Sequence, residues 1–348
     1  MKNLTFLHEK LLAWYPTHRR ALPWREDPVP YRVWISEIML QQTRIEAVIP
    51  YFERFMAELP DVFALAACDD DRLMKLWQGL GYYSRARSLK RAAEVIVRDH
   101  GGELPRDIDG LLALPGIGDY TAGAIASIAM GQPQPAVDGN VLRVVTRVTA
   151  CADDITKAPT KRAVTEALRA IYPSGESAGM LTEALMALGQ QVCIPNGEPR
   201  CEACPLAAEC EAHRQDRTGE FPVKPAKAAR KIERRTVLIL RRGGEYAVRK
   251  RPERGLLAGL WELPSLPGEA DADALAAFLA GEGLAHAGEP HDLGEAVHIF
   301  THLEWHMRGL MLEVTGEPRS LTFAPAAALR GEYAIPSAFG AYMKKILG

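Results

Sequence analysis

The chain has 348 residues, of which 47% are hydrophobic, and its formal net charge at pH 7 is −2. This length allows two domains, and the apolar content is sufficient for well-packed cores. The apolar runs are interrupted by charge or glycine within about a dozen residues, whereas a membrane-spanning helix needs roughly 20, so we expect no membrane partner. The N-terminal segment does not resemble a signal peptide, and we therefore expect a reducing, cytoplasmic compartment.

The first part of the chain, from Leu4 to about Cys210, is predicted to be helical, with no convincing strand. Breaks between helices are expected where proline or paired glycine interrupts the helical pattern: Pro16, Pro50, Pro60, Gly101–Gly102, Pro115, Pro133, Pro159 and Pro173. The segment FPVKPAKAARK that follows is rich in proline, alanine and lysine, which predicts an exposed linker.

The remainder of the chain has a mixed pattern that predicts an α+β domain. RTVLILRR and EYAVRKR flank Gly243–Gly244 in the manner of a β-hairpin. A helix is expected at about 271–281, strands near 297–303 and 306–314, and a closing helix at about 337–347.

Charge is unevenly distributed along the chain although its total is nearly neutral. Twelve Lys and Arg residues stand against three Glu between Pro222 and Arg254, and no Lys or Arg occurs from Gly255 to Met307. A near-neutral total can therefore conceal a cationic face that contacts phosphates. For Lys224–Arg235 alone, an ordinary solvated linker fits equally well.

Four cysteines follow one another with the spacing C-x7-C-x2-C-x5-C: Cys193, Cys201, Cys204 and Cys210. Four thiolates so close in sequence can hold one tetrahedral zinc ion or one cubane iron–sulfur cluster. Structural disulfides are the weaker interpretation in a reducing compartment. Zinc ribbons usually present two C-x2-C pairs and only one occurs here, which favours the cluster. Four protein thiolates leave no open coordination site, so a structural role is expected.

The motif LPGIGDYTAGA, which begins at Leu114, lies between two helix-like segments and predicts a helix–hairpin–helix. Gly116 and Gly118 permit a tight turn and a close approach of the backbone to a ligand. The amides of Gly116, Ile117 and Gly118, together with the following helix N-terminus, can hold a phosphate. A simple turn between two helices is the alternative.

Two carboxylates are candidates for catalysis. Asp138, in AVDGNVLRVVTRV, either caps the amphipathic helix that follows or stabilises a cationic sugar at a reacting centre. Glu37 lies in the apolar run YRVWISEIML. If Glu37 is buried, desolvation should raise its pKa and allow it to act as a general acid. The sequence equally allows Glu37 to face water on an amphipathic helix.

These features resemble the helix–hairpin–helix superfamily of DNA glycosylases, and Glu37 with LQQT resembles its adenine-specific MutY family. Motifs in order carry the resemblance over most of the chain: SEIMLQQTRIEAVIPYFERF, WQGLGYYSRAR, LPGIGDYTAGA, VDGNVLRV and GLLAGLWELP. The fold it implies is multidomain, α and α+β. A helix–hairpin–helix glycosylase part, with a six-helix barrel and a cluster domain around one [4Fe-4S] cluster, precedes a C-terminal domain similar to the Nudix (MutT) fold.

The implied domain boundaries follow from the positions of these motifs. We expect a glycosylase domain over residues 1–220, a linker over 221–234 and a Nudix-like 8-oxoguanine-recognition domain over 235–348. Within the first domain, about 30–133 would form the six-helix barrel, and the remainder with 193–210 would form the cluster domain.

The resemblance also implies a reaction, the excision of adenine mispaired with 8-oxoguanine or guanine in double-stranded DNA. The adenine must leave the helical stack before its glycosidic bond can be reached. Glu37 would protonate the adenine and later assist water, while Asp138 would stay ionised and stabilise the sugar cation or bond to it transiently. We expect opposite environments for the two acids, apolar for Glu37 and near helix N-terminal dipoles for Asp138. Tyr120 and Asn140 would orient the carboxylates and the sugar.

The residue at position 120 bears on the mechanism. Bifunctional relatives resembling endonuclease III carry lysine at this position, and that lysine forms a Schiff base that leads to strand cleavage. Tyrosine cannot form a Schiff base. We therefore expect a monofunctional glycosylase that leaves an abasic site.

Further DNA contacts are implied for residues that match the family's lesion-binding positions. Gln42 and Tyr82 would insert around the estranged lesion and hold the duplex distorted. Packing of Tyr82 beside Tyr83 and Trp77 is the alternative.

The family commonly recognises 8-oxoguanine with a Phe-Ser-His loop, and the corresponding residues here are Phe300, Thr301 and His302. Thr301 departs from the pattern but keeps a hydroxyl that can bond to the lesion. An edge strand with an ordinary packed phenylalanine is the alternative.

Two further departures concern the Nudix part and the cysteine loop. The segment GEADADALAAFLAGEGL lacks the glutamate pairs of a working Nudix hydrolase, so nucleotide hydrolysis is not expected. The family usually has six residues between its first two cysteines and this chain has seven, which the ligands should tolerate.

Two other functions remain open from sequence alone. One is a glycosylase of the same fold for another target, such as thymine opposite guanine or an oxidised pyrimidine; Glu37 and the C-terminal domain argue against it. The other is a non-catalytic DNA-binding module, which loss of Glu37 or Asp138 would indicate. A monomer is expected, associated with the nucleoid if the source is a bacterium.

Overall fold

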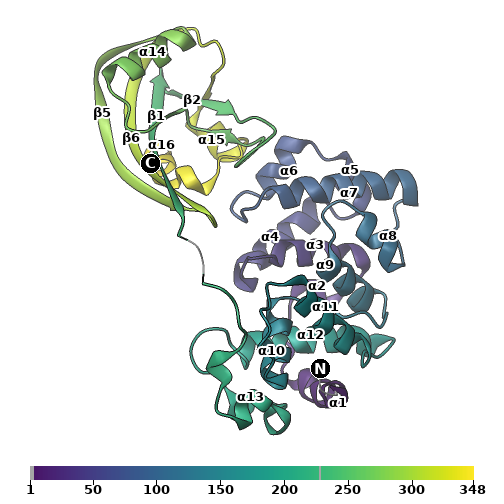
Figure 1. Ribbon diagram of the computed structural model, residues 1–348. Helices are drawn as coiled ribbons and strands as arrows, with labels where there is room; N and C mark the ends of the chain where they lie inside the picture. The colour runs from purple at the N-terminus through teal and green to yellow at the C-terminus, as the bar shows by residue number, and fades with distance from the viewer. Residues whose placement is uncertain (1–3, 227–228) are drawn as a thin grey trace. The chain divides into compact units, whose positions relative to one another are not determined.

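A computed structural model of the chain describes residues 4–226 and 229–348 (Figure 1). The chain divides into two compact units, a helical unit formed by Met1–Ala67 with Arg87–Ala226 and a mixed unit formed by Cys68–Ala86 with Lys227–Gly348. Within the expected linker, residues 227 and 228 lie outside the described residues. In the part of the chain that is described, no helix has the length and apolarity needed to cross a bilayer.

The described residues up to 226 contain helices and no strand, as expected. The α-helices of this part are α1 (Thr5–Trp14), α2 (Pro23–Glu26), α3 (Pro30–Leu40), α4 (Ile45–Glu58), α5 (Val62–Ala67), α6 (Asp70–Leu76), α7 (Ser84–His100), α8 (Ile108–Ala113), α9 (Asp119–Ala124), α10 (Gly139–Thr149), α11 (Ala158–Arg169), α12 (Glu176–Gln191) and α13 (Glu211–Arg214). A π-helical segment, Ile125–Ala129, continues α9. Short 3-10 turns are Tyr15–Thr17, Cys201–Ala203, Ala207–Glu209 and Thr218–Glu220.

The expected helix break at Pro50 is wrong, because α4 continues through this residue. Proline lacks an amide hydrogen and therefore removes one hydrogen bond from the helix. On the same helix, Val48, Phe52 and Phe55 are almost fully buried. Burial of this apolar stripe offsets the lost hydrogen bond and keeps the helix continuous.

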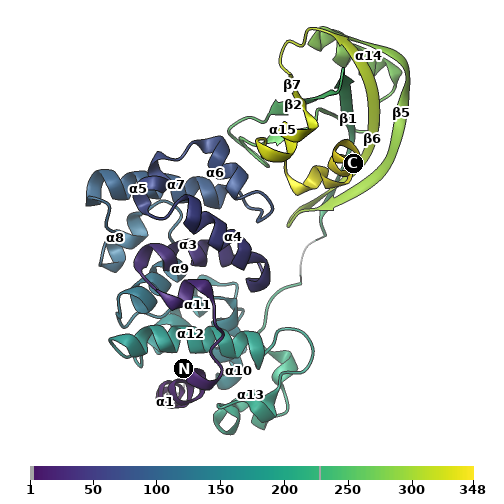
Figure 2. The ribbon, with the colours of Figure 1, turned by 180° about the vertical axis from the view of Figure 1, so that it is seen from behind.

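Helix α12 is the central element of one core of the helical unit. Eleven of its residues are buried, so the helix is apolar on nearly every side and is surrounded by protein. It packs against α1, α10 and the π-helical segment (Figures 1 and 2). Glu183 is therefore a charged residue in the middle of a buried helix.

The C-terminal part has the expected α+β composition. Its strands are β1 (Lys231–Arg242), β2 (Glu245–Lys250), β3 (Trp261–Glu262), β4 (Ser265–Pro267), β5 (Leu284–Ile299), β6 (Leu303–Gly316) and β7 (Thr322–Pro325). Its helices are α14 (Ala272–Glu282), α15 (Ala326–Gly331) and α16 (Gly340–Leu347), the last preceded by a 3-10 turn over Ser337–Phe339.

These strands form one sheet in the order β3-β2-β1-β6-β5, with β4 paired to β1 and β7 paired to β2. The hairpin around Gly243–Gly244 is confirmed, since Arg242 pairs with Glu245 at its turn. Strands β1 and β6 are parallel and supply the centre of the sheet. Apolar cores cover both faces of this centre, since Val237 and Ile239 belong to one core and Leu238 and Leu240 to the other.

The expected bounds of the strand near 297–303 are wrong. The observed strand, β5, begins earlier, at Leu284, and ends earlier, at Ile299. Strand β5 lies at the edge of the sheet, and most of its side chains are exposed. Its pairing with β6 is also interrupted by two irregularities. An exposed edge strand has few buried apolar residues, so alternation in the sequence is too weak to reveal it.

Candidate active site and cysteine loop

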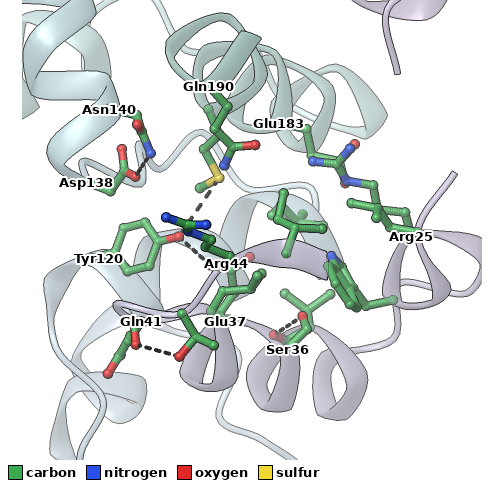
Figure 3. A pocket seen from close by; sticks show the side chains of 18 of the residues that line it. Arg25, Ser36, Glu37, Gln41, Arg44, Tyr120, Asp138, Asn140, Glu183 and Gln190 are labelled. Atoms are coloured by element: carbon green, nitrogen blue, oxygen red, sulfur yellow. Dashed lines mark hydrogen bonds and ion pairs between the residues drawn. The ribbon is translucent and has the colours of Figure 1, made fainter. Parts of the chain in front are cut away.

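A pocket of about 610 Å³ lies in the helical unit and is lined by residues of α2, α3, α9, α10 and α12. It brings together the four residues expected to be catalytic, Glu37, Tyr120, Asp138 and Asn140 (Figure 3). These residues are spread over about a hundred positions of the sequence. Their convergence in one cavity is a property of the helix packing.

Glu37 is buried in the wall of this pocket, with 5% of its surface exposed. Its neighbours on α3 are also buried, so the helix presents Glu37 to the protein interior rather than to water. Desolvation is the main cause that raises the pKa of Glu37 from 4.5 to about 7, and the negative charge of Asp138 acts in the same direction. Of the two alternatives, the structure therefore selects the buried carboxyl group.

Tyr120 reaches Glu37 from α9, and its hydroxyl donates a hydrogen bond to Glu37 Oε2 (Figure 3). This hydrogen bond partly opposes the desolvation of the carboxylate and lowers the pKa of Glu37. Burial, followed by the nearby charge of Glu37, raises the pKa of the Tyr120 phenol well above its ordinary value. Tyr120 therefore stays protonated and serves as a donor.

Asp138 is both a helix cap and a member of the pocket, so the two alternatives for this residue are compatible. Its Oδ1 accepts the backbone N–H of Val141 at 2.7 Å, at the start of α10. Its Oδ2 accepts Asn140 Nδ2 at 2.6 Å (Figure 3). Three carboxyl groups share the pocket, the third being Glu183.

The expected contrast between the two acids is only partly present. Asp138 does lie at a helix N-terminus, but burial raises the pKa of Asp138 as it raises that of Glu37. For Asp138, hydrogen bonds from Val141 and Asn140 counteract the desolvation. Glu37 and Asp138 thus differ in the number of hydrogen bonds that each carboxyl group accepts.

Arg143 is a member of the site that the sequence analysis missed. Its Nη2 donates to Asn140 Oδ1 at 2.9 Å and to the carbonyl oxygen of Gly189 at 2.6 Å. Its Nε donates to the carbonyl oxygen of Cys193 at 2.7 Å. Arg143 therefore links two parts of the structure: Asn140, whose amide group orients Asp138, and Cys193, the first cysteine of the loop. An arginine in the apolar run NVLRVV was the available signal.

Arg25 and Glu183 are also pocket residues that the sequence analysis missed. Arg25 Nε lies 3.1 Å from Glu183 Oε1, and both side chains are largely buried. Tyr15 donates its hydroxyl to Glu183 Oε2 at 2.8 Å. A buried ion pair in a pocket can hydrogen-bond to a polar ligand edge, because both donors and a carboxylate acceptor are present. The glutamate inside the apolar segment LTEALMALG was the signal.

The helix–hairpin–helix is formed by α8 and α9, with Gly116 in the left-handed region at φ +79°. A side chain at Gly116 would collide with Ser88, because an added Cβ would lie 2.5 Å from Ser88 Cβ. At Gly118 an added Cβ would meet nothing within 4 Å, so the backbone is open to a ligand. The Ile117 amide already donates to the Leu114 carbonyl oxygen at 3.2 Å. Of the three amides that were expected to hold a phosphate, the one of Ile117 is thus already engaged within the hairpin.

Gln42 and Tyr82 share an unusual backbone conformation, with φ values of 59° and 46°. Non-glycine residues rarely adopt this region, and such residues concentrate at functional sites. Gln42 is exposed at the pocket wall. Tyr82 is 44% exposed and therefore is not packed into the core as Trp77 and Tyr83 are.

The residues expected to form the lesion-reading loop, Phe300, Thr301 and His302, connect β5 to β6. The Phe300 ring packs edge-on against Trp305 at 4.9 Å, so the description as a packed phenylalanine is correct for this residue. Thr301 and His302 are exposed at the turn. The Thr301 hydroxyl is hydrogen-bonded to the Tyr82 hydroxyl, which belongs to the same compact unit.

The four cysteines of the loop line one small cavity: Cys193, Cys201, Cys204 and Cys210. None of them forms a disulfide. The rest of the lining is mostly apolar, with Val144, Val148 and Leu188 among it. Within the ranges 4–226 and 229–348, no group of three or more His, Cys, Asp or Glu residues is arranged to hold a single metal ion.

The chemistry of this cavity fits an iron–sulfur cluster. Burial is the main cause that raises the pKa of Cys204 to about 12, so a bound metal cation would be needed to hold its thiolate form. Arg147 Nη1 lies 3.4 Å from Cys193 Sγ and supplies a charge-assisted donor to sulfur. Four thiols, apolar walls and a donor to sulfur are what a buried cluster requires.

Comparison with known proteins identifies the family of the chain. The family model of the HhH-GPD superfamily of base excision DNA repair proteins matches residues 35–170. The family model of the NUDIX domain matches residues 235–345. The adenine DNA glycosylase of Rattus norvegicus is 32% identical over 99% of this chain and 78% of its own length. The adenine DNA glycosylase of Homo sapiens is 33% identical, over 99% of this chain and 74% of its own length.

Solved structures support the fold of the helical part. A thermostable thymine-DNA glycosylase is 28% identical with a TM-score of 0.54, covering 60% of this chain and 95% of that protein. An endonuclease III trapped as a covalent intermediate with DNA is 25% identical with a TM-score of 0.52, covering 61% of this chain and 95% of that protein. The chain therefore belongs to the adenine DNA glycosylase family, whose members hydrolyse N-glycosyl bonds, and carries a helix–hairpin–helix glycosylase domain followed by a Nudix domain.

Proposed function

We propose that this chain excises adenine mispaired with 8-oxoguanine or guanine in double-stranded DNA, and that it is monofunctional and leaves an abasic site. The observation that carries the proposal is the shared pocket of Glu37 and Asp138, in which the pKa of Glu37 is about 7. A carboxyl group with this pKa is partly protonated near neutral pH and can return to its ionised form within one turnover.

The proposed reaction assigns different tasks to the two acids. Protonated Glu37 donates its proton to the flipped adenine, which makes the base a better leaving group. Ionised Asp138 then stabilises the positive charge that develops on the sugar, and the ionised Glu37 accepts a proton from the attacking water. Tyr120 holds Glu37, and Asn140 holds Asp138, through the hydrogen bonds described above.

Arg25 and Glu183 support adenine as the bound base. Arginine offers donors to the ring nitrogens of a purine, and a carboxylate accepts from an exocyclic amino group. Their ion pair lines the same pocket as Glu37, so a flipped base can meet all three groups. Thymine has no exocyclic amino group that could donate to such a carboxylate.

The monofunctional mechanism rests on Tyr120. A lyase reaction of the Schiff-base type needs an amine nucleophile in reach of the sugar. Among the residues that the structure describes, the only Lys or Arg residues that line the pocket are Arg25 and Arg44, and arginine remains protonated and does not form a Schiff base. Hydrolysis by water is therefore the proposed route.

The cysteine loop would hold one [4Fe-4S] cluster through Cys193, Cys201, Cys204 and Cys210. When bound, the cluster cross-links the loop and supplies no open coordination site for substrate. Arg143 and Arg147 of α10 bind backbone carbonyl oxygens of the loop at Cys193 and Ile194. The loop and helix α10, which Asp138 caps, are thereby fixed to each other.

The remaining expectations form part of the same proposal. Gly116, Ile117 and Gly118 would bind a phosphate, Gln42 and Tyr82 would enter the duplex, and Phe300, Thr301 and His302 would contact 8-oxoguanine. The glycosylase domain is proposed to span 1–220 and the Nudix-like domain 235–348, with 221–234 as linker. We propose that the protein acts as a monomer in the cytoplasm.

The test is single-turnover excision on duplexes that contain one 8-oxoguanine:adenine, guanine:adenine or guanine:thymine pair. Abasic sites are revealed as strand breaks by alkali, and parallel samples without alkali report any lyase activity. The Glu37→Gln variant serves as the chemical control, because it keeps the shape of the side chain and removes its acid.

Alkali-dependent breaks at adenine, absent in the Glu37→Gln variant, are the expected result. Excision of thymine from the guanine:thymine duplex, or breaks that form without alkali, would contradict the proposed substrate or the monofunctional mechanism. If cluster-loaded protein binds DNA but excises no base, the remaining interpretation is a non-catalytic DNA-binding module.

A further inference from the structure

A second cavity, of about 690 Å³, lies beside the active-site pocket in the helical unit. Its walls are α8, α9, the segment 134–137 and α11, and α9 and α11 lie next to each other in both views (Figures 1 and 2). Gln41 and Tyr120 line this cleft and also line the active-site pocket. The Gln41 amide lies 3.4 Å from the Thr121 hydroxyl at this shared boundary. The cleft therefore begins where the active-site pocket ends.

Helix α11 presents a cationic face to the cleft. Its lining residues occur at positions 158, 161, 162, 165, 166 and 169, a spacing that places them on one face of a helix. Thr160, Val164 and Leu168 are buried and fix the opposite side in the core. Lys161, Arg162 and Arg169 are therefore held at the cleft by a rigid helix.

These three cations are exposed, and no ion pair is recorded for them among the described residues. Other exposed arginines of the helical unit do have carboxylate partners in some cases, for example Arg98 with Asp99 at 2.7 Å. The carboxylates of the cleft are Asp119 and Glu166, so the lining carries three positive and two negative charges. The cleft has positive charge that is not neutralised.

The active-site pocket has no such excess of positive charge. Its lining has three carboxyl groups, Glu37, Asp138 and Glu183, against two arginines. With Glu37 protonated, as the proposed reaction requires, the two remaining carboxylates match the two arginines, so the pocket has no excess of positive charge to attract a phosphodiester. Gln41 and Tyr120 line both spaces, so the backbone of a nucleotide whose base enters the pocket can continue along this boundary into the cationic cleft.

We propose that this cleft binds the phosphodiester backbone of the strand from which the base is removed, next to the flipped nucleotide, through Lys161, Arg162 and Arg169. The proposal rests on the proposed function, since it requires a nucleotide flipped into the pocket. From position 161 to 169 the helix rises about 12 Å. Phosphates of one strand follow each other every ~3.4 Å along the duplex axis, so the face spans more than one phosphate.

The opposite wall of the cleft suits a backbone ligand as well. Gly118 is exposed there and has open space above its Cα. Its amide lies on the hairpin side of the cleft, and the cations lie on the α11 side. Contacts of this kind hold a strand without reading its sequence, so they position the DNA for excision.

The test measures equilibrium binding to a duplex with one 8-oxoguanine:adenine pair and to an undamaged duplex, over a series of salt concentrations. All proteins carry Glu37→Gln so that the substrate stays intact. The variant removes the three cations together, Lys161→Ala, Arg162→Ala and Arg169→Ala. Each lost phosphate contact lowers the slope of log affinity against log salt by about 0.9, so a decrease of about 2 to 3 is expected on both duplexes.

Two further variants keep the test decisive. Glu166→Gln removes a negative charge from the cleft and should strengthen binding at low salt. Arg98→Ala removes an exposed cation that is already paired on α7, and is expected to leave the salt slope as it is. Apart from Glu37→Gln, which all the proteins share, the substitutions are at exposed positions, and thermal unfolding checks that each variant is folded.

Phosphate ethylation interference then locates the contact on the DNA. We expect interference at phosphates on one side of the adenine in its own strand, lost in the triple variant. The inference is overturned if the triple variant keeps the parent slope and interference pattern, or if Glu166→Gln weakens binding. The proposed function fails separately, if protein with native Glu37 excises no adenine from the same duplex.

Discussion

The Tyr120 hydroxyl donates a hydrogen bond to Glu37 Oε2 inside the pocket, and this contact links two residues separated by 83 positions in the chain. The donor favours the ionised form of Glu37 and therefore lowers its pKa against the effect of burial. The hydrogen bond thus keeps the pKa of Glu37 near 7 instead of higher. Arg25 lowers the same pKa, and Asp138 and Glu183 raise it.

Replacing Tyr120 by phenylalanine is expected to raise the pKa of Glu37, because the carboxylate loses its donor. The pH profile of single-turnover excision should fall with rising pH as Glu37 loses its proton, and this descending limb should move to higher pH in Tyr120→Phe. A descending limb that stays in place, or moves to lower pH, would show that the hydroxyl does not act on Glu37. Tyr31→Phe, a tyrosine outside the pocket, is the control.

Glu37 is expected to destabilise the fold at neutral and alkaline pH. Its pKa is raised in the folded state, so the folded protein binds more protons than the unfolded chain between pH 4.5 and about 7. The contribution of Glu37 to the free energy of unfolding therefore falls as pH rises through this window, by about 3 kcal/mol in total. Glu37→Gln should raise the free energy of unfolding at pH 8 and have a smaller effect at pH 5. Urea unfolding at the two pH values measures the difference, and equal effects at both would count against burial of an ionisable group.

Asp138 combines two tasks that different substitutions can separate. Asp138→Asn keeps an oxygen that can accept the Val141 N–H and removes the charge, so excision should fall by about 10²–10³-fold with little loss of stability. Asp138→Ala removes the cap as well and should cost about 1 kcal/mol of stability. Single-turnover rates and thermal unfolding of both variants give the comparison. Retained excision in Asp138→Asn would assign this residue to capping alone.

Arg143 should be a positioning residue with a large structural contribution. Arg143→Leu leaves the acceptors of Asn140, Gly189 and Cys193 without their donor, and each unpaired buried acceptor costs about 1–3 kcal/mol. Arg143→Lys keeps a charge and should restore part of this stability. If Arg143 also positions Asp138 through Asn140, the Lys variant, once folded, will excise more slowly than the parent at saturating protein. An unchanged rate would limit Arg143 to stabilising the loop.

The cysteine loop predicts a defined metal content. Protein purified without oxygen should contain about four irons per chain, as expected for a [4Fe-4S] cluster. Cys204→Ser should lose this iron, because Cys204 lines the cavity, whereas Cys151→Ser should retain it. One zinc per chain in the parent protein would instead indicate a zinc site. Loss of iron in both variants would show that general instability, not ligation, is responsible.

The sequence by itself determined the features that depend on neighbouring residues. The hairpin around Gly116 needs a residue without a side chain, the cap at Asp138 needs an acceptor before a helix, and the strand pair around Gly243–Gly244 needs a tight turn. The spacing of the four cysteines likewise lies within eighteen residues of sequence. Motifs of this kind were sufficient to identify the family.

Only the tertiary structure decided which charged residues are buried and what they contact. Glu37, Arg143 and Glu183 each stand in an apolar helix, and the sequence does not say which face meets the protein interior. Desolvation and hydrogen bonding depend on elements that pack against the helix from far along the chain, as Tyr120 does on Glu37. The pKa of the acid, the Arg143 connection and the cationic cleft beside α11 are therefore properties of packing. They follow from long-range contacts that local spacing does not encode.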